Sequence, residues 1–348
     1  MHQPFRTMLT IAGGLLIAGL GFAQQQQRSA GPADRDRVGA LMSQREPAKL
    51  APPVAEDFKP VFVVPKFKPI SEAPALNRAD VRDQVTDAEL VLGVVINGQA
   101  RAYPINMLTG PEREIVNDTL DGHPIAATWC HLCNNAVVYD RRVDGRTLTF
   151  AVSGMLWNRN LVMYDIETDS LWAHLLGEAK QGTLIGTKLS IVPGETTTWA
   201  DWALQHPDTT VLNMSRTATS YKTGVYEDRA RFVYGWLAGR RPFHIRMDAL
   251  DGNPVRNLST NGKALLLSFD TGATRAVLAS REVDGKTLSF ERQSDGRLRD
   301  TQTSSIWDPA TLKAVSGQLA GKQLAQEAGM FAFRDAWTEF HPASEAIQ

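Results

Sequence analysis

The feature that most constrains the fold is a similarity of the sequence to itself. Residues 143–150 read VDGRTLTF, and residues 283–290 read VDGKTLSF, 140 positions later. Residues 165–172 recur as residues 300–307, at an offset of 135. The second offset also relates two glycines, a tryptophan and a His-Pro pair in each half: Gly182 and Gly317, Gly186 and Gly321, Trp202 and Trp337, His206 and His341. Matches in one order at a nearly constant offset indicate a duplicated unit.

Each half contains short alternating or β-branched runs separated by turn residues, a pattern typical of hairpin-linked strands. In the first half the predicted strands cover residues 91–96, 125–129, 136–142, 147–153 and 161–164. Residues 198–205 predict a short helix that Thr196 or Thr197 caps and that ends at His206. The sequence therefore predicts a β-rich α+β fold, a tandem duplication of a mainly antiparallel β domain with short helices.

The beginning of the chain resembles a secretory signal peptide. Arg6 precedes an apolar run over residues 8–22, and small residues follow at Gly21 and Ala23. We expect residues 1–23 to be removed and the protein to be periplasmic or secreted. The run is too short for a comfortable membrane span, which takes about 20 apolar residues, and no later stretch approaches that length. We therefore expect no stable membrane span after signal removal.

The rest of the chain divides by composition and by the repeat. Residues 24–84 are rich in Gln and Pro and lack apolar periodicity, which predicts a flexible leader. Residues 85–215 form the predicted first repeat, and residues 228–345 form the second. The formal net charge of −1 provides no basic surface for nucleic acid. The partners stay unknown, and an envelope protein is one possibility.

Comparing the two halves separates scaffold from candidate site. Trp172 and Asp165 recur as Trp307 and Asp300, which indicates structural roles in both halves. Cys130 and Cys133, the only two cysteines, have no counterpart, because WCHLCN at 129–134 aligns with FDTGAT at 269–274. Four neighbouring polar residues of the first half are also replaced in the second: His131, Asn135, His174 and Glu178 align with Thr271, Arg275, Pro309 and Lys313. The second repeat is therefore predicted to be a degenerate copy without the site.

A Cys-x-x-Cys pair in an exported protein is compatible with several chemistries. The two thiols can form a redox-active dithiol. They can also bind zinc or copper together with His131, His174 or His123. A single cysteine nucleophile with His174 as base, oriented by Glu178 or Asp165, is a further alternative. Covalent c-type haem is excluded because Asn134 stands where histidine is required.

The remaining alternative is a structural disulfide. The loop that a bridge between Cys130 and Cys133 would close is short, so the bridge is predicted to contribute little stability. Polar and aromatic residues between the cysteines and residue 178 are candidates for binding a ligand. These are Asn134, Asn135, Ser153, Trp157, Asn158 and Glu178.

Seven segments together resemble one bacterial and archaeal family, the domain of unknown function 3179. They read VVINGQARAYP at 94–104, EIVNDT at 114–119, TWCHLCNNA at 128–136, YDRRVDG at 139–145, FAVSG at 150–154, LVMYD at 161–165 and LWAHLLGEA at 171–179. The resemblance implies a family-like site at Cys130, Cys133, Asn134, Ser153 and Glu178, and no settled activity. Members often carry proline after the first cysteine, where this chain has His131.

The sequence leaves two functions open. The first is an exported protein with a metal-binding or redox thiol site at Cys130 and Cys133, in which copper or zinc would be the metal. The alternative is a non-catalytic envelope interaction module whose cysteines form a structural disulfide. Whether the protein is an enzyme is not decided by its sequence.

Overall fold

The computed structural model describes residues 32–81, 84–217 and 221–348. The fold contains 45% strand and 14% helix, and its sheets are mostly antiparallel. The predicted class, a β-rich α+β fold with short helices, is confirmed. The predicted signal peptide lies outside the described residues. None of the helices in these three ranges is long and apolar enough to cross a membrane.

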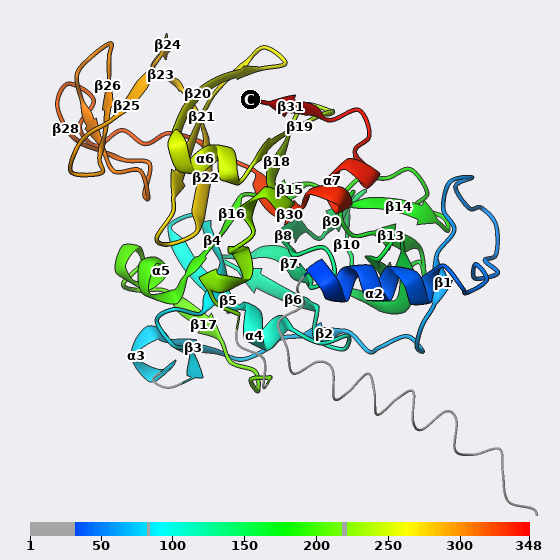
Figure 1. The fold of residues 1–348 in the computed structure, drawn as a ribbon. Helices are drawn as coiled ribbons and strands as arrows, with labels where there is room; N and C mark the ends of the chain where they lie inside the picture. Colours follow the sequence, from blue (N-terminus) through cyan, green and yellow to red (C-terminus); the bar gives the residue numbers. More distant parts are fainter. Residues whose placement is uncertain (1–31, 82–83, 218–220) are drawn as a thin grey trace, which may run out of the picture.

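The described residues of the first half form three five-stranded sheets and one small hairpin (Figure 1). One has the order β16 (Gly194–Thr198), β4 (Leu90–Ile96), β5 (Gln99–Pro104), β17 (Thr210–Leu212) and β3 (Ala75–Asn77). The next has β15 (Ile191–Val192), β8 (Asn135–Asp140), β7 (His123–Cys130), β6 (Ile115–Leu120) and β2 (Ile70–Ser71). The third has β1 (Val61–Phe62), β11 (Phe150–Trp157), β12 (Asn160–Asp165), β13 (Leu171–Ala173) and β14 (Glu178–Gln181).

The predicted strands of the first half are present, with two differences. The run predicted as a single strand over residues 136–142 is divided between β8 and β9 (Arg142–Val143). The run predicted over residues 147–153 is divided between β10 (Arg146–Thr147), which pairs with β9, and β11. The Asn97-Gly98 and Asp144-Gly145 turns have positive φ at both positions, the geometry that a tight hairpin of type I′ requires.

The second half repeats this order of elements. One sheet has the order β30 (Gly329–Phe333), β18 (Phe232–Ala238), β19 (Arg241–Arg246) and β31 (Glu345–Ile347). The next has β20 (Val255–Thr260), β21 (Lys263–Asp270), β22 (Arg275–Ser280) and β29 (Gln326–Glu327). The third has β25 (Phe290–Arg292), β26 (Leu298–Asp300), β27 (Ile306–Trp307) and β28 (Ala314–Ser316). The small hairpin recurs as β23 (Glu282–Val283) and β24 (Lys286–Thr287). A duplication would produce this recurrence, and the duplication itself stays a prediction.

Part of the segment predicted as a flexible leader is built into the first half. It forms α2 (Pro32–Met42), and residues 61–77 then add β1, β2 and β3 to the edges of the three sheets. We call residues 61–77 the strap. Its strands are two or three residues long, too short to produce the alternation from which strands are recognised. In the second half, the described residues place no such strand on the corresponding edges, β25, β20 and β31.

Short helices connect the strands. They are α3 (Arg78–Val81), α4 (Ile105–Leu108), α5 (Trp199–Gln205), α6 (Asp248–Gly252) and α7 (Arg334–Phe340), with 3-10 turns η2 (Thr223–Tyr226) and η3 (Arg229–Arg231). The cap of α5 is Thr198, whose hydroxyl accepts from the Asp201 backbone N at 3.3 Å, and not the predicted Thr196 or Thr197. Thr197 instead donates to the Asp201 carboxylate at 2.8 Å. The helix ends at His206, as predicted.

The residues shared by both halves are structural. Trp172 and Trp307 are fully buried, and each indole N–H donates to an aspartate, Asp165 at 2.9 Å and Asp300 at 3.0 Å.

The two halves also pack against each other through related contacts. The Phe333 backbone N donates to the Cys133 carbonyl at 2.8 Å, and the Thr198 backbone N donates to the Ala273 carbonyl at 3.2 Å. The cysteine turn of the first half therefore meets the start of α7 from the second half.

Candidate functional site

The two cysteines lie on the tight turn between β7 and β8. Cys130 ends β7, and the Cys133 backbone N donates to the Cys130 carbonyl at 3.1 Å. Asn134 has a φ of 48°, in the left-handed region that asparagine tolerates, and it returns the chain into β8. The Sγ atoms are 2.8 Å apart, with the Cys130 thiol donating to Cys133, and no disulfide joins them. Both side chains are buried.

Cys133 is surrounded by groups that stabilise negative charge on sulfur. The Asn160 amide donates to its Sγ at 3.1 Å, and Nη1 of Arg35 lies 3.9 Å from it. The third contact is the Arg159 carbonyl at 3.5 Å, which accepts from the thiol when the thiol is protonated. The contacts of Sγ of Cys133 thus include one cation and one amide donor.

Cys130 lies in different surroundings. Burial raises the pKa of its thiol well above the ordinary value, the neighbouring Cys133 and the Glu114 carboxylate add to the rise, and His131 opposes it. Cys130 therefore keeps its proton. The two sulfurs of the turn therefore differ in the groups that contact them.

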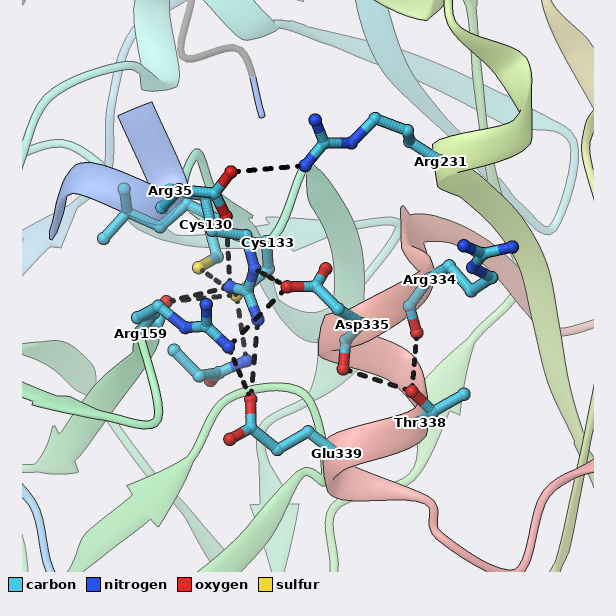
Figure 2. Close-up of polar contacts among 12 residues, drawn as sticks. Arg35, Cys130, Cys133, Arg159, Arg231, Arg334, Asp335, Thr338 and Glu339 are labelled. Carbon is cyan, nitrogen blue, oxygen red and sulfur yellow. Dashed lines mark hydrogen bonds and ion pairs between the residues drawn. The ribbon is translucent and has the colours of Figure 1, made fainter. Parts of the chain in front are cut away.

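Arg35 reaches this turn from α2 and is 1% exposed (Figure 2). Its guanidinium donates to the Leu132 carbonyl at 2.9 Å and to the Asp335 carboxylate at 2.8 Å, and it lies 3.6 Å from the Glu339 carboxylate. Burial by itself would lower the pKa of Arg35, but Cys133, Asp335 and Cys130 offset that effect and raise it. The arginine is charged, and it links α2, the cysteine turn and α7.

The predicted histidine ligands do not converge on the cysteines. Nδ1 of His131 lies 2.7 Å from the Glu114 carboxylate. His174 is fully buried, with Nε2 2.7 Å from the Thr128 hydroxyl, and burial lowers its pKa to about 3. His123 pairs with Asp140 at 3.0 Å. Within the three described ranges, no group of three or more His, Cys, Asp or Glu side chains is arranged to hold a metal ion.

The other predicted site residues fall into two places. Asn134 and Asn135 lie on the cysteine turn, where Asn134 accepts from the Tyr226 hydroxyl at 2.7 Å and Asn135 donates to the Phe331 carbonyl at 2.8 Å. The contact with Phe331 reaches into the second half, and Tyr226 lies in the segment that connects the halves. Ser153 lies within β11 and donates to the Val162 carbonyl at 2.6 Å, so it holds the sheet together.

Trp157, Asn158 and Glu178 line a cavity of about 520 Å³ between the two halves. Glu178 pairs there with Lys180 at 3.1 Å and with Lys188 at 3.2 Å. Glu339 also lines this cavity, so the cavity borders the carboxylates around Arg35.

The sequence did not single out five residues that contact Cys133 or Arg35: Arg35, Arg159, Asn160, Asp335 and Glu339. A signal existed for two of them, because Asp335 and Glu339 align at the offset of 135 with Ala200 and Leu204. The second half thus has two carboxylates at positions where the first half has apolar side chains. Arg35 had no such signal, because the leader has no counterpart.

The sequence model of one protein family matches residues 60–344, and that family is described as "Protein of unknown function (DUF3179)". No curated protein and no solved structure matches the chain.

Proposed function

The chain belongs to the DUF3179 family, whose description names no reaction, and from the site alone we propose that it carries out thiol–disulfide exchange through Cys130 and Cys133. The observation that carries this proposal is the difference between the two sulfurs. Cys133 faces the Asn160 amide and the Arg35 guanidinium, whereas burial keeps Cys130 protonated. In a dithiol that exchanges disulfides, one sulfur attacks as a thiolate and the other resolves the mixed disulfide.

The reaction would proceed in two balanced steps. The Cys133 thiolate attacks a substrate disulfide, which forms a mixed disulfide and releases one substrate sulfur as a thiolate. Sγ of Cys130, 2.8 Å away, then attacks Sγ of Cys133 and transfers its proton to the second substrate sulfur as that sulfur leaves. The dithiol is oxidised by two electrons and the substrate disulfide is reduced by two. The reverse sequence would oxidise a substrate dithiol.

The geometry favours exchange over metal binding. The two sulfurs would supply two thiolate ligands, but His131 and His174 are each bonded to another side chain. A structural zinc site takes four ligands, so a metal would need further groups beyond the cysteines. We also propose that the protein works in the periplasm or outside the cell, where substrate disulfides persist.

The test is a redox titration of the full chain in glutathione buffers, with thiols trapped by alkylation and counted by intact mass. We expect one reversible two-electron transition that Cys133→Ser abolishes. Cys130→Ser should accumulate a mixed disulfide with glutathione on Cys133, because the resolving sulfur is missing. Elemental analysis of the same sample, purified without chelator, reports any metal.

Two outcomes would overturn the proposal. Stoichiometric zinc or copper with both thiols protected from oxidation would establish a metal site. A disulfide that no glutathione ratio reduces would establish a structural cross-link, which is the role that an interaction module requires.

A further inference from the structure

The guanidinium of Arg35 is enclosed by oxygen atoms of the cysteine turn, of Arg159 and of α7. We call the space that it fills the Arg35 pocket. The carbonyls of Leu132 and Arg159 face Nη1 at 2.9 and 3.5 Å, and the Asp335 carboxylate accepts from Nε at 2.8 Å. The Glu339 carboxylate lies 3.6 Å from Nη2. A planar fork of N–H donors matches such a set of oxygens, whereas the compact ammonium group of lysine matches it poorly.

The helix α7 does not need the two carboxylates of this pocket in order to form. Asp335 and Glu339 lie on α7, and the corresponding helix α5 forms with Ala200 and Leu204 at these positions. Arg159 pairs with both carboxylates, at 3.6 Å to Asp335 and 3.2 Å to Glu339, but it does not fill the pocket. The two carboxylates thus form a cation-binding wall next to Cys133.

The helix that fills the pocket is separable from the sheets. Among the side chains of α2 that the structure describes, those of Arg35, Val38 and Met42 are buried, and Asp36 forms an ion pair with Arg231 at 3.5 Å. A helix of eleven residues is marginal on its own, so its docking depends on contacts such as these. The strap begins only at residue 61, so α2 can leave while β1, β2 and β3 stay in their sheets.

Access to the sulfurs requires such a movement. Cys133 is fully buried, and Arg35 lies across it with α7 on the other side (Figure 2). A substrate disulfide can reach Cys133 only after one of the groups around it moves, and departure of Arg35 with α2 would open such a path. The group that replaces Arg35 would meet the same two carbonyls and two carboxylates.

We propose that the pocket holding Arg35 is a recognition subsite for an arginine-bearing segment of the partner protein whose sulfur exchanges with Cys133, and that α2 occupies this subsite until such a segment displaces it. This inference rests on the proposed exchange function, and it adds the chemical class of the partner. Because α2 is tethered to the same chain, its effective concentration is high, and a partner must bind strongly to compete.

The experiment compares two disulfide probes on the full chain. The probes are thionitrobenzoate mixed disulfides of acetyl-Arg-Cys-amide and of acetyl-Glu-Cys-amide, and release of the chromophore reports the rate. Arg35→Ala opens the pocket but also removes the cation beside Cys133, so the readout is the ratio of the two rates within each protein. In Arg35→Ala we expect the arginine probe to react about tenfold faster than the glutamate probe, as one charge-assisted contact provides. The wild type should not discriminate between the two probes.

Two sets of variants control the comparison. Asp335→Asn with Glu339→Gln in the Arg35→Ala background should make the two probes react equally. Leu41→Ala, which removes an exposed side chain from the same helix, should behave like the wild type. If Arg35→Ala does not fold, Arg35→Gln keeps polar atoms in the pocket and is used in its place.

The outcomes separate this inference from the function on which it rests. An Arg35→Ala variant that reacts with both probes at equal rates would refute the subsite and leave the exchange function intact. Failure of every variant to react with either probe, while the protein stays folded, would refute the exchange function itself.

Discussion

At the scale of single residues, the two cysteines differ only in what surrounds their sulfur atoms. Sγ of Cys130 lies in a buried site near the Glu114 carboxylate, and its pKa is raised. Sγ of Cys133 accepts from the Asn160 amide and faces Arg35. The same side chain is therefore a proton carrier at one position and a potential nucleophile three residues later.

The Asn160 amide provides a direct test of this difference. In Asn160→Asp a carboxylate replaces the donor, while the retained oxygen still accepts from the Leu175 backbone N. The carboxylate no longer donates to Sγ of Cys133, so the reduced dithiol loses stability relative to the disulfide. The midpoint potential of the dithiol should therefore become more negative by at least about 30 mV, the equivalent of about 1.4 kcal/mol. Glutathione titration measures it. Asn158→Asp, two residues away, is the control, and equal shifts in both variants would contradict the assigned role of Asn160.

At the scale of elements, the strap determines how the first half is completed. The strap lies against β11 at Gly154, whose carbonyl accepts from the backbone N of Val63 at 2.9 Å and of Val64 at 3.1 Å. Gly154 has a φ of 76°, and a Cβ atom there would lie 1.9 Å from the Val64 carbonyl oxygen. Only glycine allows the strap to lie against this bend.

We therefore expect Gly154→Ala to displace the strap and to lower the free energy of unfolding by about 3 kcal/mol, from left-handed strain plus overpacking. Gly145 has the same φ of 76°, but a Cβ atom added there would meet no other atom within 4 Å, so it is the matched control. Gly145→Ala should cost only the strain, about 1–2 kcal/mol. Urea unfolding measures both variants, and equal losses would show that the strap does not press on Gly154.

At the scale of the whole molecule, the two halves share a core. One continuous hydrophobic cluster includes residues of both halves, and a smaller cluster lies around β25–β28, which project at one side of Figure 1. Glu195 on β16 is buried where the halves meet, 7% exposed, near Arg275 of β22. Burial raises its pKa from 4.5 to about 7, with Arg275 opposing the rise and Asp201 adding to it.

This carboxyl should make the stability of the molecule depend on pH. The unfolded carboxyl ionises near pH 4.5 and the folded one near pH 7, so the folded state binds the proton more tightly. The stabilisation is present below pH 4.5 and is lost as the pH rises to about 7, at a total of about 3 kcal/mol. Glu195→Gln should therefore gain about that much relative to the wild type between pH 4.5 and pH 8.

Urea unfolding across that pH range measures the difference between the two proteins. Glu291→Gln on the exposed surface of β25 is the matched control. A difference between wild type and Glu195→Gln that stays constant with pH would show that Glu195 does not titrate in this range.

The sequence by itself determined the local features of this protein. It predicted the β-rich class and the strands on either side of the two cysteines, because alternating runs and Asn-Gly or Asp-Gly turns act between near neighbours in the chain. It also identified Cys130 and Cys133 as the positions where the halves differ most.

The tertiary structure alone decided what surrounds those cysteines. Arg35 and Asp335 are 300 residues apart in the chain and meet beside the sulfurs, and the strap forms strands only against edges that already exist. The tertiary structure also separated His174 from the site, by burying it in the core. The physical reason is that the charge on a thiol and the pairing of a short strand depend on neighbours in space, and no local pattern in the sequence encodes those neighbours.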